Sequence, residues 1–335
     1  MMNEFKELVR EVTSVYGPSG REQKAAALLA DKIRPFVDEI VSDPLGNVIG
    51  IKRGTSGKRI MLSAHMDQIG LIVLDIDEKG FLRFAPVGGI DPEMTIGREV
   101  VFENGVRGVV YREEKEVKPP AKLTQMFIDI GCSSREEAEK HVSVGDICVY
   151  AAHFIDMGSR IACCALDDRL CCAVLVEVMK RIDSPHDVYC VFTTQEEVGS
   201  RGAKAAAYSV NPDFGINLDV TASADTPECD PMPMAMGNGP TVKYMDRSAV
   251  ITKPVIDFMH AVAEKRGIKV QNEILRYGGT DAGEVQPMRG GKAACCVSIP
   301  TRYVHSPIET ADLTDCLEAV DFVCAMAQEK ELPAE

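Results

Sequence analysis

Two kinds of hydrophobic periodicity follow one another along the N-terminal part of the chain. Residues 4–15 and 21–37 carry apolar side chains at helical spacing, and the sequence GPSG between them interrupts that spacing. Residues 38–54 instead favour two short strands around a PLGN turn, and residues 59–67 favour a buried strand that ends in polar side chains. We therefore expect two helices followed by the first strands of a sheet.

The pattern changes between residues 69 and 152, where strand signals dominate. Strands are expected at residues 71–87 and 100–114 (two hairpins), 127–131 and 145–156. One short helix is expected after Ser133, because Ser134 and Glu137 have the spacing of a capping box. This region predicts a small β-rich module.

Strands and longer helices alternate after about Arg169. Helices are expected at residues 169–182, 200–210, 248–267 and 313–330, and strands at 187–195, 214–220, 268–275 and 293–299. Such alternation favours an α/β fold: a mixed, largely parallel sheet flanked by helices on both faces. The β-rich module interrupts this fold. We expect a discontinuous catalytic α/β domain (residues 1–68 and 153–335) with an inserted β-rich domain (residues 69–152).

Composition and charge narrow the classes of function. The chain has 335 residues and a formal net charge of −14, which argues against binding to nucleic acid or to anionic lipid headgroups. No stretch approaches 18 uninterrupted apolar residues, and the first residues form a charged amphipathic segment. We therefore expect a cytoplasmic protein with neither a membrane span nor a signal peptide.

Twelve cysteines raise the question of a disulfide framework. Disulfide-dense chains are usually short and secreted, whereas this chain is long. Three vicinal pairs lie inside apolar runs, at Cys163-Cys164, Cys171-Cys172 and Cys295-Cys296. We expect reduced, mostly buried cysteines. Thiol chemistry stays a minor alternative, since no cysteine falls in a nucleophile motif beside a histidine.

Five strand-like apolar runs end in side chains that could bind a metal ion. These side chains are His65 with Asp67, Asp167 with Asp168, Glu196 with Glu197, Asp219, and His305. In open α/β sheets, ligands bind beyond the carboxyl ends of the strands, so these groups could converge there. Carboxylates together with imidazoles suit two divalent ions that share a ligand, such as Zn²⁺, Co²⁺ or Mn²⁺.

Each of these residues also has a purely structural explanation. Asp167 or Asp168 could cap the helix that follows, and Glu196 and Glu197 could be first-turn charges of a helix. Asp219 could start a turn. Spacing alone leaves the metal site and these structural roles equally open.

The order of several motifs resembles the M42 group of dinuclear metallo-aminopeptidases, relatives of glutamyl aminopeptidase and of the TET peptidases. The matching segments are YGPSGRE, DPLGNVIG, SAHMDQIG, VGGID, ALDDR, TTQEEVGSRGA, LDVTASAD, GGTDAG and IPTRYVHSPIE. They run through nearly the whole chain. One local departure is the pair Cys163-Cys164 before ALDDR, where relatives commonly carry a polar residue.

The resemblance implies a role for each matching residue. It implies that His65 and Asp219 bind one ion, that Glu197 and His305 bind the other, and that Asp167 bridges both. It implies further that Asp67 supports His65 and that Glu196 is the general base. It also implies a cis bond between Asp167 and Asp168. The implied cofactors are two divalent ions per subunit, Zn²⁺ or Co²⁺ and also Mn²⁺.

The implied activity is removal of N-terminal residues from peptides, with a metal-bridged water as nucleophile and Glu196 as base. The resemblance further implies a homo-oligomer, a dodecamer built through dimers of the inserted domain. An amidohydrolase or deacylase of acylated amino acids and a non-catalytic, metal-stabilised assembly protein are the alternatives. An endoglucanase is disfavoured because the chain has no Trp and 6% aromatic residues. An acidic, hydrophobic or basic N-terminal residue remains open.

Two further segments have open roles. GGTDAG could form a tight turn close to the active site, or it could start a helix with Thr280 as N-cap. Arg302 and Tyr303 could line the substrate cleft or tie down the loop that carries His305.

Overall fold

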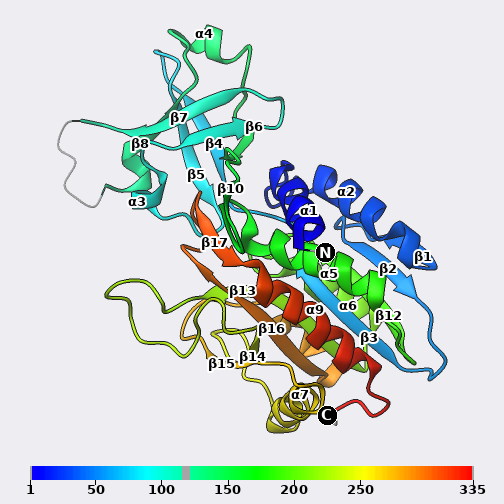
Figure 1. The fold of residues 1–335 in the computed structure, drawn as a ribbon. Coiled ribbons are helices and arrows are strands. Elements are labelled where there is room, and N and C mark those ends of the chain that lie inside the picture. Colours follow the sequence, from blue (N-terminus) through cyan, green and yellow to red (C-terminus); the bar gives the residue numbers. More distant parts are fainter. Residues whose placement is uncertain (1, 115–120, 334–335) are drawn as a thin grey trace.

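The computed structural model describes residues 2–114 and 121–333, which form a large mixed sheet with helices and a smaller closed barrel (Figure 1). The barrel projects from the end of the sheet at which β10 and β17 lie. Each part has its own hydrophobic core. The predicted fold class, an α/β sheet interrupted by β-rich structure, is confirmed.

The large sheet contains the strands that carry the candidate ligands. In spatial order its strands are β1 (Glu39–Ser42), β2 (Val48–Lys52), β12 (Asp187–Thr193), β3 (Arg59–His65), β13 (Phe214–Ala222), β16 (Ala293–Arg302), β17 (Glu309–Asp312), β11 (Arg160–Cys163) and β10 (Ile155–Met157). The central strands β12, β3, β13 and β16 pair in parallel, and the flanking pairs are antiparallel. Their apolar side chains are almost continuously buried, as expected for parallel strands covered on both faces.

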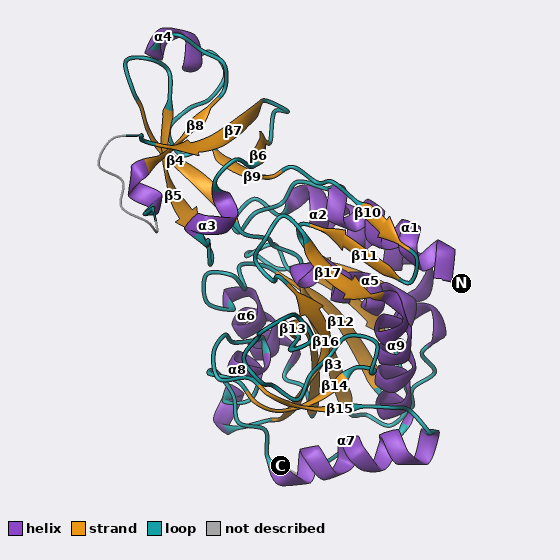
Figure 2. Ribbon diagram, turned by 60° about the vertical axis from the view of Figure 1, so that its left-hand side comes forward, coloured by secondary structure: helices purple, strands orange, loops and turns teal. Residues whose placement is uncertain are grey.

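Helices cover both faces of this sheet (Figure 2). One face carries α1 (Met2–Ser14), α2 (Gln23–Ile33), α5 (Leu166–Arg181) and α9 (Leu313–Gln328), and the other carries α6 (Arg201–Val210) and α8 (Ala282–Val285). Helix α5 is buried almost all round, because it packs against the sheet on one side and against α1 and α9 on the other. Its regular turns begin after Asp168, in agreement with the predicted start at Arg169, because the backbone at Asp167 and Asp168 is not helical.

The barrel explains the strand-rich texture of its sequence. Its strands, in order around the barrel, are β4 (Gly70–Ile76), β5 (Leu82–Val87), β8 (Met126–Asp129), β7 (Arg107–Arg112), β6 (Glu99–Phe102) and β9 (Ile147–Tyr150). Short helices α3 (Pro92–Thr95) and α4 (Arg135–Ala138) and a 3-10 turn at Leu123–Gln125 connect them. The hydroxyl of Ser134 accepts a hydrogen bond from the Glu137 backbone N–H and caps α4, as predicted.

Two predicted elements are wrong in extent. Residues 145–156 are not one strand: β9 ends at Tyr150 inside the barrel, and β10 begins at Ile155 in the large sheet, since the chain must cross between the two bodies here. The helix predicted at residues 248–267 begins only at Lys253, where α7 (Lys253–Arg266) starts with Pro254 in its first turn. Proline is common in the first turn of a helix, because the N–H that it lacks would have no hydrogen-bond partner there.

The strand predicted at residues 268–275 lies outside the large sheet. It is β15 (Gln271–Ile274), and it pairs in parallel with β14 (Thr241–Met245), a strand that was not predicted. This two-stranded sheet lies beside β16 and under α7.

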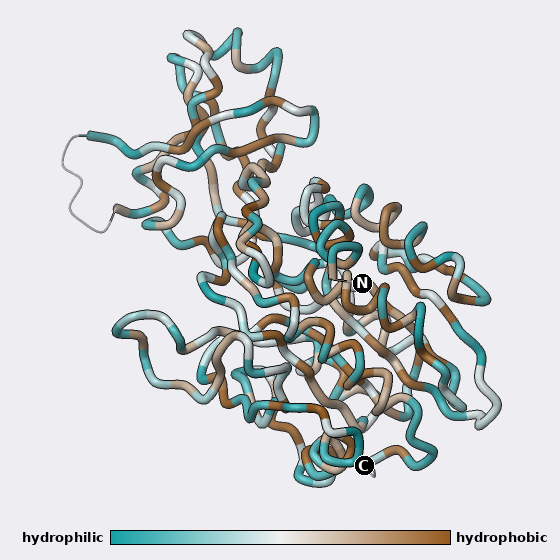
Figure 3. The backbone as a smooth tube through the Cα atoms, in the orientation of Figure 1, coloured by the Kyte–Doolittle hydropathy of each residue, from teal (hydrophilic) through white to brown (hydrophobic). Residues whose placement is uncertain are grey.

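Hydropathy along the chain agrees with this layering, with the brown, apolar segments gathered in the sheet and in its facing helices (Figure 3). All twelve cysteines are free thiols, and ten are buried, Cys132 and Cys229 being more accessible. Burial raises the pKa values of the Cys171 and Cys172 thiols well above the usual value for cysteine, which disfavours the reactive thiolate. The expectation of buried, unpaired cysteines is confirmed. Across residues 2–114 and 121–333, no helix combines the length and apolar character needed to cross a membrane.

Candidate active site

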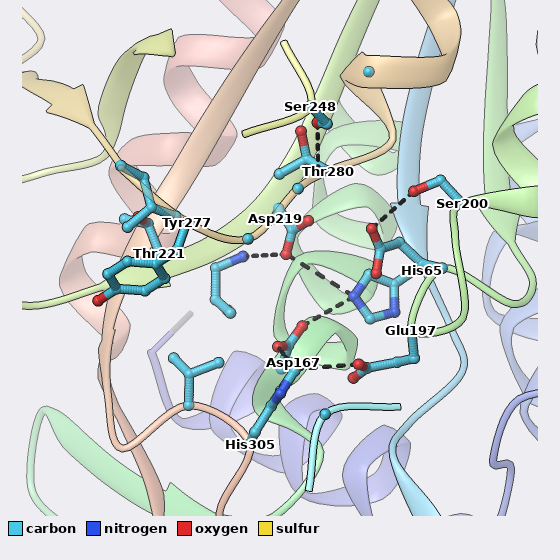
Figure 4. Close-up of a pocket in the computed structure, with 18 of the residues that line it drawn as sticks. His65, Asp167, Glu197, Ser200, Asp219, Thr221, Ser248, Tyr277, Thr280 and His305 are labelled. Carbon is cyan, nitrogen blue, oxygen red and sulfur yellow. Dashed lines mark hydrogen bonds and ion pairs between the residues drawn. The ribbon is translucent and has the colours of Figure 1, made fainter. Parts of the chain in front are cut away.

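The predicted site residues come together at the carboxyl ends of the central parallel strands (Figure 4). His65 is the last residue of β3, and Asp219 lies near the end of β13. The loop after β12 carries Glu196 and Glu197. Parallel strands end at one edge of the sheet, which is why residues distant in sequence meet here.

Asp167 stands between the two histidines. Its Oδ1 lies 2.9 Å from His65 Nε2, and its Oδ2 lies 3.2 Å from His305 Nε2. Glu197 Oε2 is 3.1 Å from the same His305 nitrogen, and Asp219 Oδ1 is 3.9 Å from His65 Nε2. The five residues therefore form two groups that share the Asp167 carboxylate.

The donor set fits divalent cations. Ligand atoms of His65, Asp167 and Glu197 all lie within 4.8 Å of one another. Glu197 Oε1 is buried without a hydrogen-bond partner among the described residues. Burial and the neighbouring carboxylate Asp167 raise the pKa of Glu197, and burial raises that of Asp219 well above its usual value. Divalent cations bound among these buried carboxylates would stabilise their charged forms, which two imidazoles alone do not balance.

The start of α5 differs from a simple capped helix. The Asp167–Asp168 bond is cis, as the resemblance implied. The backbone at Asp167 and Asp168 is not helical, so both residues stand ahead of the regular turns of α5. Asp168 is fully buried, and its Oδ2 accepts a hydrogen bond of 3.2 Å from the backbone N–H of His65. Together with His65 and Asp219, it forms a second set of ligand atoms within 4.8 Å.

Asp67 connects the ends of two strands. Its Oδ1 lies 3.5 Å from His65 Nδ1 and accepts a hydrogen bond of 2.9 Å from the backbone N–H of Glu196. Its Oδ2 accepts hydrogen bonds from the Glu197 N–H (3.2 Å) and from the Ser19 hydroxyl (2.6 Å). Burial alone would raise the pKa of Asp67, but the hydrogen bond with His65 holds it below its usual value.

Glu196 lines the cavity beside the cluster. The Ser200 hydroxyl donates a hydrogen bond of 2.9 Å to its Oε1. Burial, together with the nearby carboxylates Asp281 and Glu197 and against the opposing effect of His65, raises the pKa of Glu196 to about 8. A carboxyl with a pKa near neutrality is suited to exchange protons.

Sequence reasoning assigned no role to three residues that hold the site in place. Glu309 Oε2 accepts a hydrogen bond from the Asp167 N–H (3.1 Å), and its Oε1 accepts one from the His305 N–H (2.8 Å). The other two are Ser19 and Ser200, which bond to Asp67 and Glu196. All three lie inside the matching motifs, at YGPSGRE, TTQEEVGSRGA and IPTRYVHSPIE. Membership in these motifs could therefore have pointed to them.

The backbone around the site is unusual. Ala165, Gln195, Ser200, Tyr303 and His305 all adopt positive φ angles between 47° and 63°. Such angles are uncommon for residues with a Cβ atom and tend to cluster at functional sites.

The cluster opens into a cavity of about 740 Å³. GGTDAG forms a turn at its wall, with Gly278 at φ +71°, and α8 begins only after Asp281. Thr280 is therefore not an N-cap. Arg302 bonds Asp225 through two nitrogens (2.8 and 2.7 Å), so it ties down the loop rather than lining the cavity.

The barrel also reaches this site. A Cβ atom on Gly89, just after β5, would lie 2.6 Å from His305 Nδ1. One on Gly88 would lie 3.1 Å from Glu197 Oε2. The loop VGGID thus packs its backbone directly against two candidate ligands.

The class of protein that this geometry defines is a metal-dependent hydrolase. The model of the M42 glutamyl aminopeptidases matches residues 46–322. A protein of Acetivibrio thermocellus, named provisionally as an aminopeptidase, is 45% identical over 316 residues, which cover 94% of this chain and 96% of that relative.

Solved structures agree. An aminopeptidase of the archaeon Desulfurococcus kamchatkensis superposes with a TM-score of 0.94 at 36% identity, covering 98% of this chain and 95% of that one. The TET1 peptidase of Pyrococcus horikoshii, described as assembling into a tetrahedron or a large octahedral shell, has a TM-score of 0.87 at 32% identity, with 97% and 99% covered. The chain therefore belongs to the M42 aminopeptidase family, which confirms the resemblance of its motifs, and it is a peptidase.

Proposed function

We propose that this protein removes N-terminal residues from peptides at a centre of two divalent ions. His65 and Asp219 would hold one ion, Glu197 and His305 the other, and Asp167 both. The observation that carries the proposal is the Asp167 carboxylate, whose two oxygens face two different histidines. Glu196 is near the cluster but bonds Ser200 instead, which leaves it available as a base.

The chain's own groups supply orientation and proton transfer. When bound, the two ions would polarise the scissile carbonyl and make the attacking water acidic. Asp67 faces His65 Nδ1 and so favours a proton on that nitrogen, with the lone pair on Nε2 toward the ligand cluster. The Glu196 carboxylate takes the proton of the attacking water and delivers it to the nitrogen of the leaving amine. Ser200 holds Glu196 Oε1 during this exchange.

The proposed metal identity follows from the chemistry of the ligands, and the proposed oligomeric state follows from similar proteins. Imidazole and carboxylate ligands suit Zn²⁺ or Co²⁺, and also Mn²⁺. The large assemblies described for the TET1 peptidase support a homo-oligomer, for which a dodecamer is the expected size. We assign residues 1–68 and 153–335 to the catalytic domain and residues 69–152 to a domain that mediates oligomerisation. A cytoplasmic location and peptide substrates complete the proposal.

The test uses full-length protein, freed of metal by chelation and reloaded with Zn²⁺ or Co²⁺. We expect two ions per chain and turnover of aminoacyl anilides, with N-acetylated anilides as poor substrates. Glu196→Gln should still bind two ions but lose about 10²–10⁴-fold in kcat, because it lacks the base. Metal-loaded protein without activity on any free aminoacyl anilide, or full activity in Glu196→Gln, would contradict the proposal. A preference for acetylated substrates would indicate a deacylase.

A further inference from the structure

The cavity extends beyond the candidate ligands into a part whose wall is largely glycine. Gly199, Gly278, Gly279 and Gly283 all line it. A Cβ atom on Gly283 would come within 2.6 Å of the Ser248 side chain, and one on Gly279 within 3.1 Å of it. The backbones of Gly279 and Gly283 therefore lie close against Ser248, and none of the four glycines sends a side chain into the cavity. This leaves room for a long side chain of the substrate.

Charge in this part of the cavity has one sign. Outside the candidate ligands and Glu196, Glu284 is the single charged residue among the described residues that line the cavity. That lining includes neither lysine nor arginine. An acidic substrate side chain would find no lysine or arginine in that lining and would meet the like charge of Glu284.

Glu284 is accessible to a new partner. Its Oε2 lies 3.3 Å from Lys204 Nζ, on α6, but the Lys204 side chain is 67% exposed and that of Glu284 is 32% exposed. Ion pairs of this exposure contribute little to stability, so a substrate cation can compete with Lys204 for the carboxylate.

The remaining wall suits an aliphatic chain. Leu275, Tyr277 and Thr280 line the same cavity with an aliphatic, an aromatic and a hydroxyl side chain. A lysine or arginine side chain has an apolar stem and a charged end, which matches a cavity lined by apolar residues, glycines and the Glu284 carboxylate.

We propose that this cavity selects peptides whose N-terminal residue is lysine or arginine, that it disfavours glutamate and aspartate, and that Glu284 determines this specificity. The inference rests on the proposed aminopeptidase function and names its substrate class. Glu284 recognises the cationic end of the N-terminal side chain, while the candidate metal ligands and Glu196 carry out the hydrolysis.

The test measures kcat/KM of the metal-loaded, full-length protein for the anilides of lysine, leucine and glutamate. The wild type should favour lysine over glutamate by at least about tenfold, because like charges in a cleft repel strongly. Glu284→Gln should lower the lysine-to-leucine ratio by about fivefold, the upper range for an ion pair of this exposure. Lys204→Gln should raise that ratio, since it removes the competing cation. Glu264→Gln, an exposed change on α7, is the control with an unchanged ratio.

Several results would overturn the specificity and leave the function intact. These are equal turnover of lysine and glutamate anilides, an unchanged ratio in Glu284→Gln, a lowered ratio in Lys204→Gln, or a lysine preference that follows the second residue of a dipeptide. Failure of the proposed function gives a different result, which is no turnover of any anilide by protein that carries two ions.

Discussion

Asp67 shows how a single side chain organises the candidate centre. It faces His65 and also accepts hydrogen bonds from the backbone of Glu196 and Glu197. One carboxylate therefore fixes a candidate ligand at the end of β3 and the candidate base at the end of β12. Ser19, which also holds Asp67, should matter for catalysis although it is not part of the cavity lining.

Ser19 provides the first prediction. Its hydroxyl donates a hydrogen bond of 2.6 Å to Asp67 Oδ2 in a buried setting. Ser19→Ala removes a hydrogen bond to a charged group, a contribution of about 1.5–3 kcal/mol, so kcat/KM for an aminoacyl anilide should fall by at least about tenfold. Ser14→Ala, at an exposed position of α1, serves as the control. Unchanged kcat/KM in Ser19→Ala would show that Asp67 is held without it.

Glu309 provides the second prediction. Its carboxylate accepts the backbone N–H groups of both Asp167 and His305. In Glu309→Gln, the amide nitrogen cannot accept one of these hydrogen bonds, so a candidate ligand is displaced. Metal affinity, measured by competition with a chromogenic chelator, should fall by about 10–100-fold, as is typical for groups that orient metal ligands. Glu7→Gln, on the exposed face of α1, should bind metal like the wild type.

At the scale of elements, the two-stranded sheet of β14 and β15 supports the cavity wall. Lys243 is fully buried, and its Nζ bonds Glu273 and lies 3.4 Å from Asp246 Oδ2. Asp246 in turn accepts hydrogen bonds from Ser248 and from the Thr280 hydroxyl (3.2 Å). A buried charge network thus connects this sheet to two residues that line the cavity.

Loss of Lys243 should destabilise the protein. Lys243→Met leaves the Glu273 carboxylate buried without its cation, which costs about 3–5 kcal/mol. The thermal midpoint should fall by at least about 5 °C, a shift that differential scanning calorimetry resolves. The double variant Lys243→Met/Glu273→Gln should recover part of the loss, because the glutamine side chain is uncharged and its carbonyl oxygen can still accept the hydroxyl of Thr241, while Asp246 stays without its cation. A double variant less stable than Lys243→Met would contradict a charge-based cause.

At the scale of the whole molecule, the barrel contributes to the candidate centre as well as projecting from it. The loop after β5 brings the backbone of Gly88 and Gly89 against Glu197 and His305. A side chain at either position would push a candidate ligand aside. The arrangement of barrel and sheet is therefore part of the geometry of the site.

Gly89→Ala tests that connection. The new Cβ atom would stand 2.6 Å from His305 Nδ1 and 2.9 Å from its Cε1, so the imidazole ring must move. We expect the second of two ions to bind at least about tenfold more weakly, while the thermal midpoint of the metal-free protein changes little. Metal content and midpoint are measured on the same sample. Two ions bound with wild-type affinity would show that the loop can yield without displacing His305.

Much of this architecture could be predicted from the sequence. The strand ending at His65 is a continuous apolar run, the helix α9 has helical periodicity, and the motifs indicated residues that the structure brings together at one edge of the sheet. The strand β14 was missed because Thr241 and Lys243 are polar yet buried, their polarity being satisfied by Glu273. Glu309 was assigned no role because its partners are the backbone N–H groups of Asp167 and His305, which lie 142 and 4 positions away in the sequence. Such contacts are visible only in the folded structure.

The closed barrel has a consequence for how the chain reaches its native state. His65 and Asp167 are 102 positions apart, so bringing them together directly would close a long loop. Strands β4 and β9, at the two ends of the barrel, pair with each other, with Ile72 opposite Ile147. Once the barrel has formed, it brings the flanking segments close together, and the remaining loop is short. Because loop-closure entropy grows with loop length, a barrel that forms first reduces the entropy lost when the candidate centre comes together.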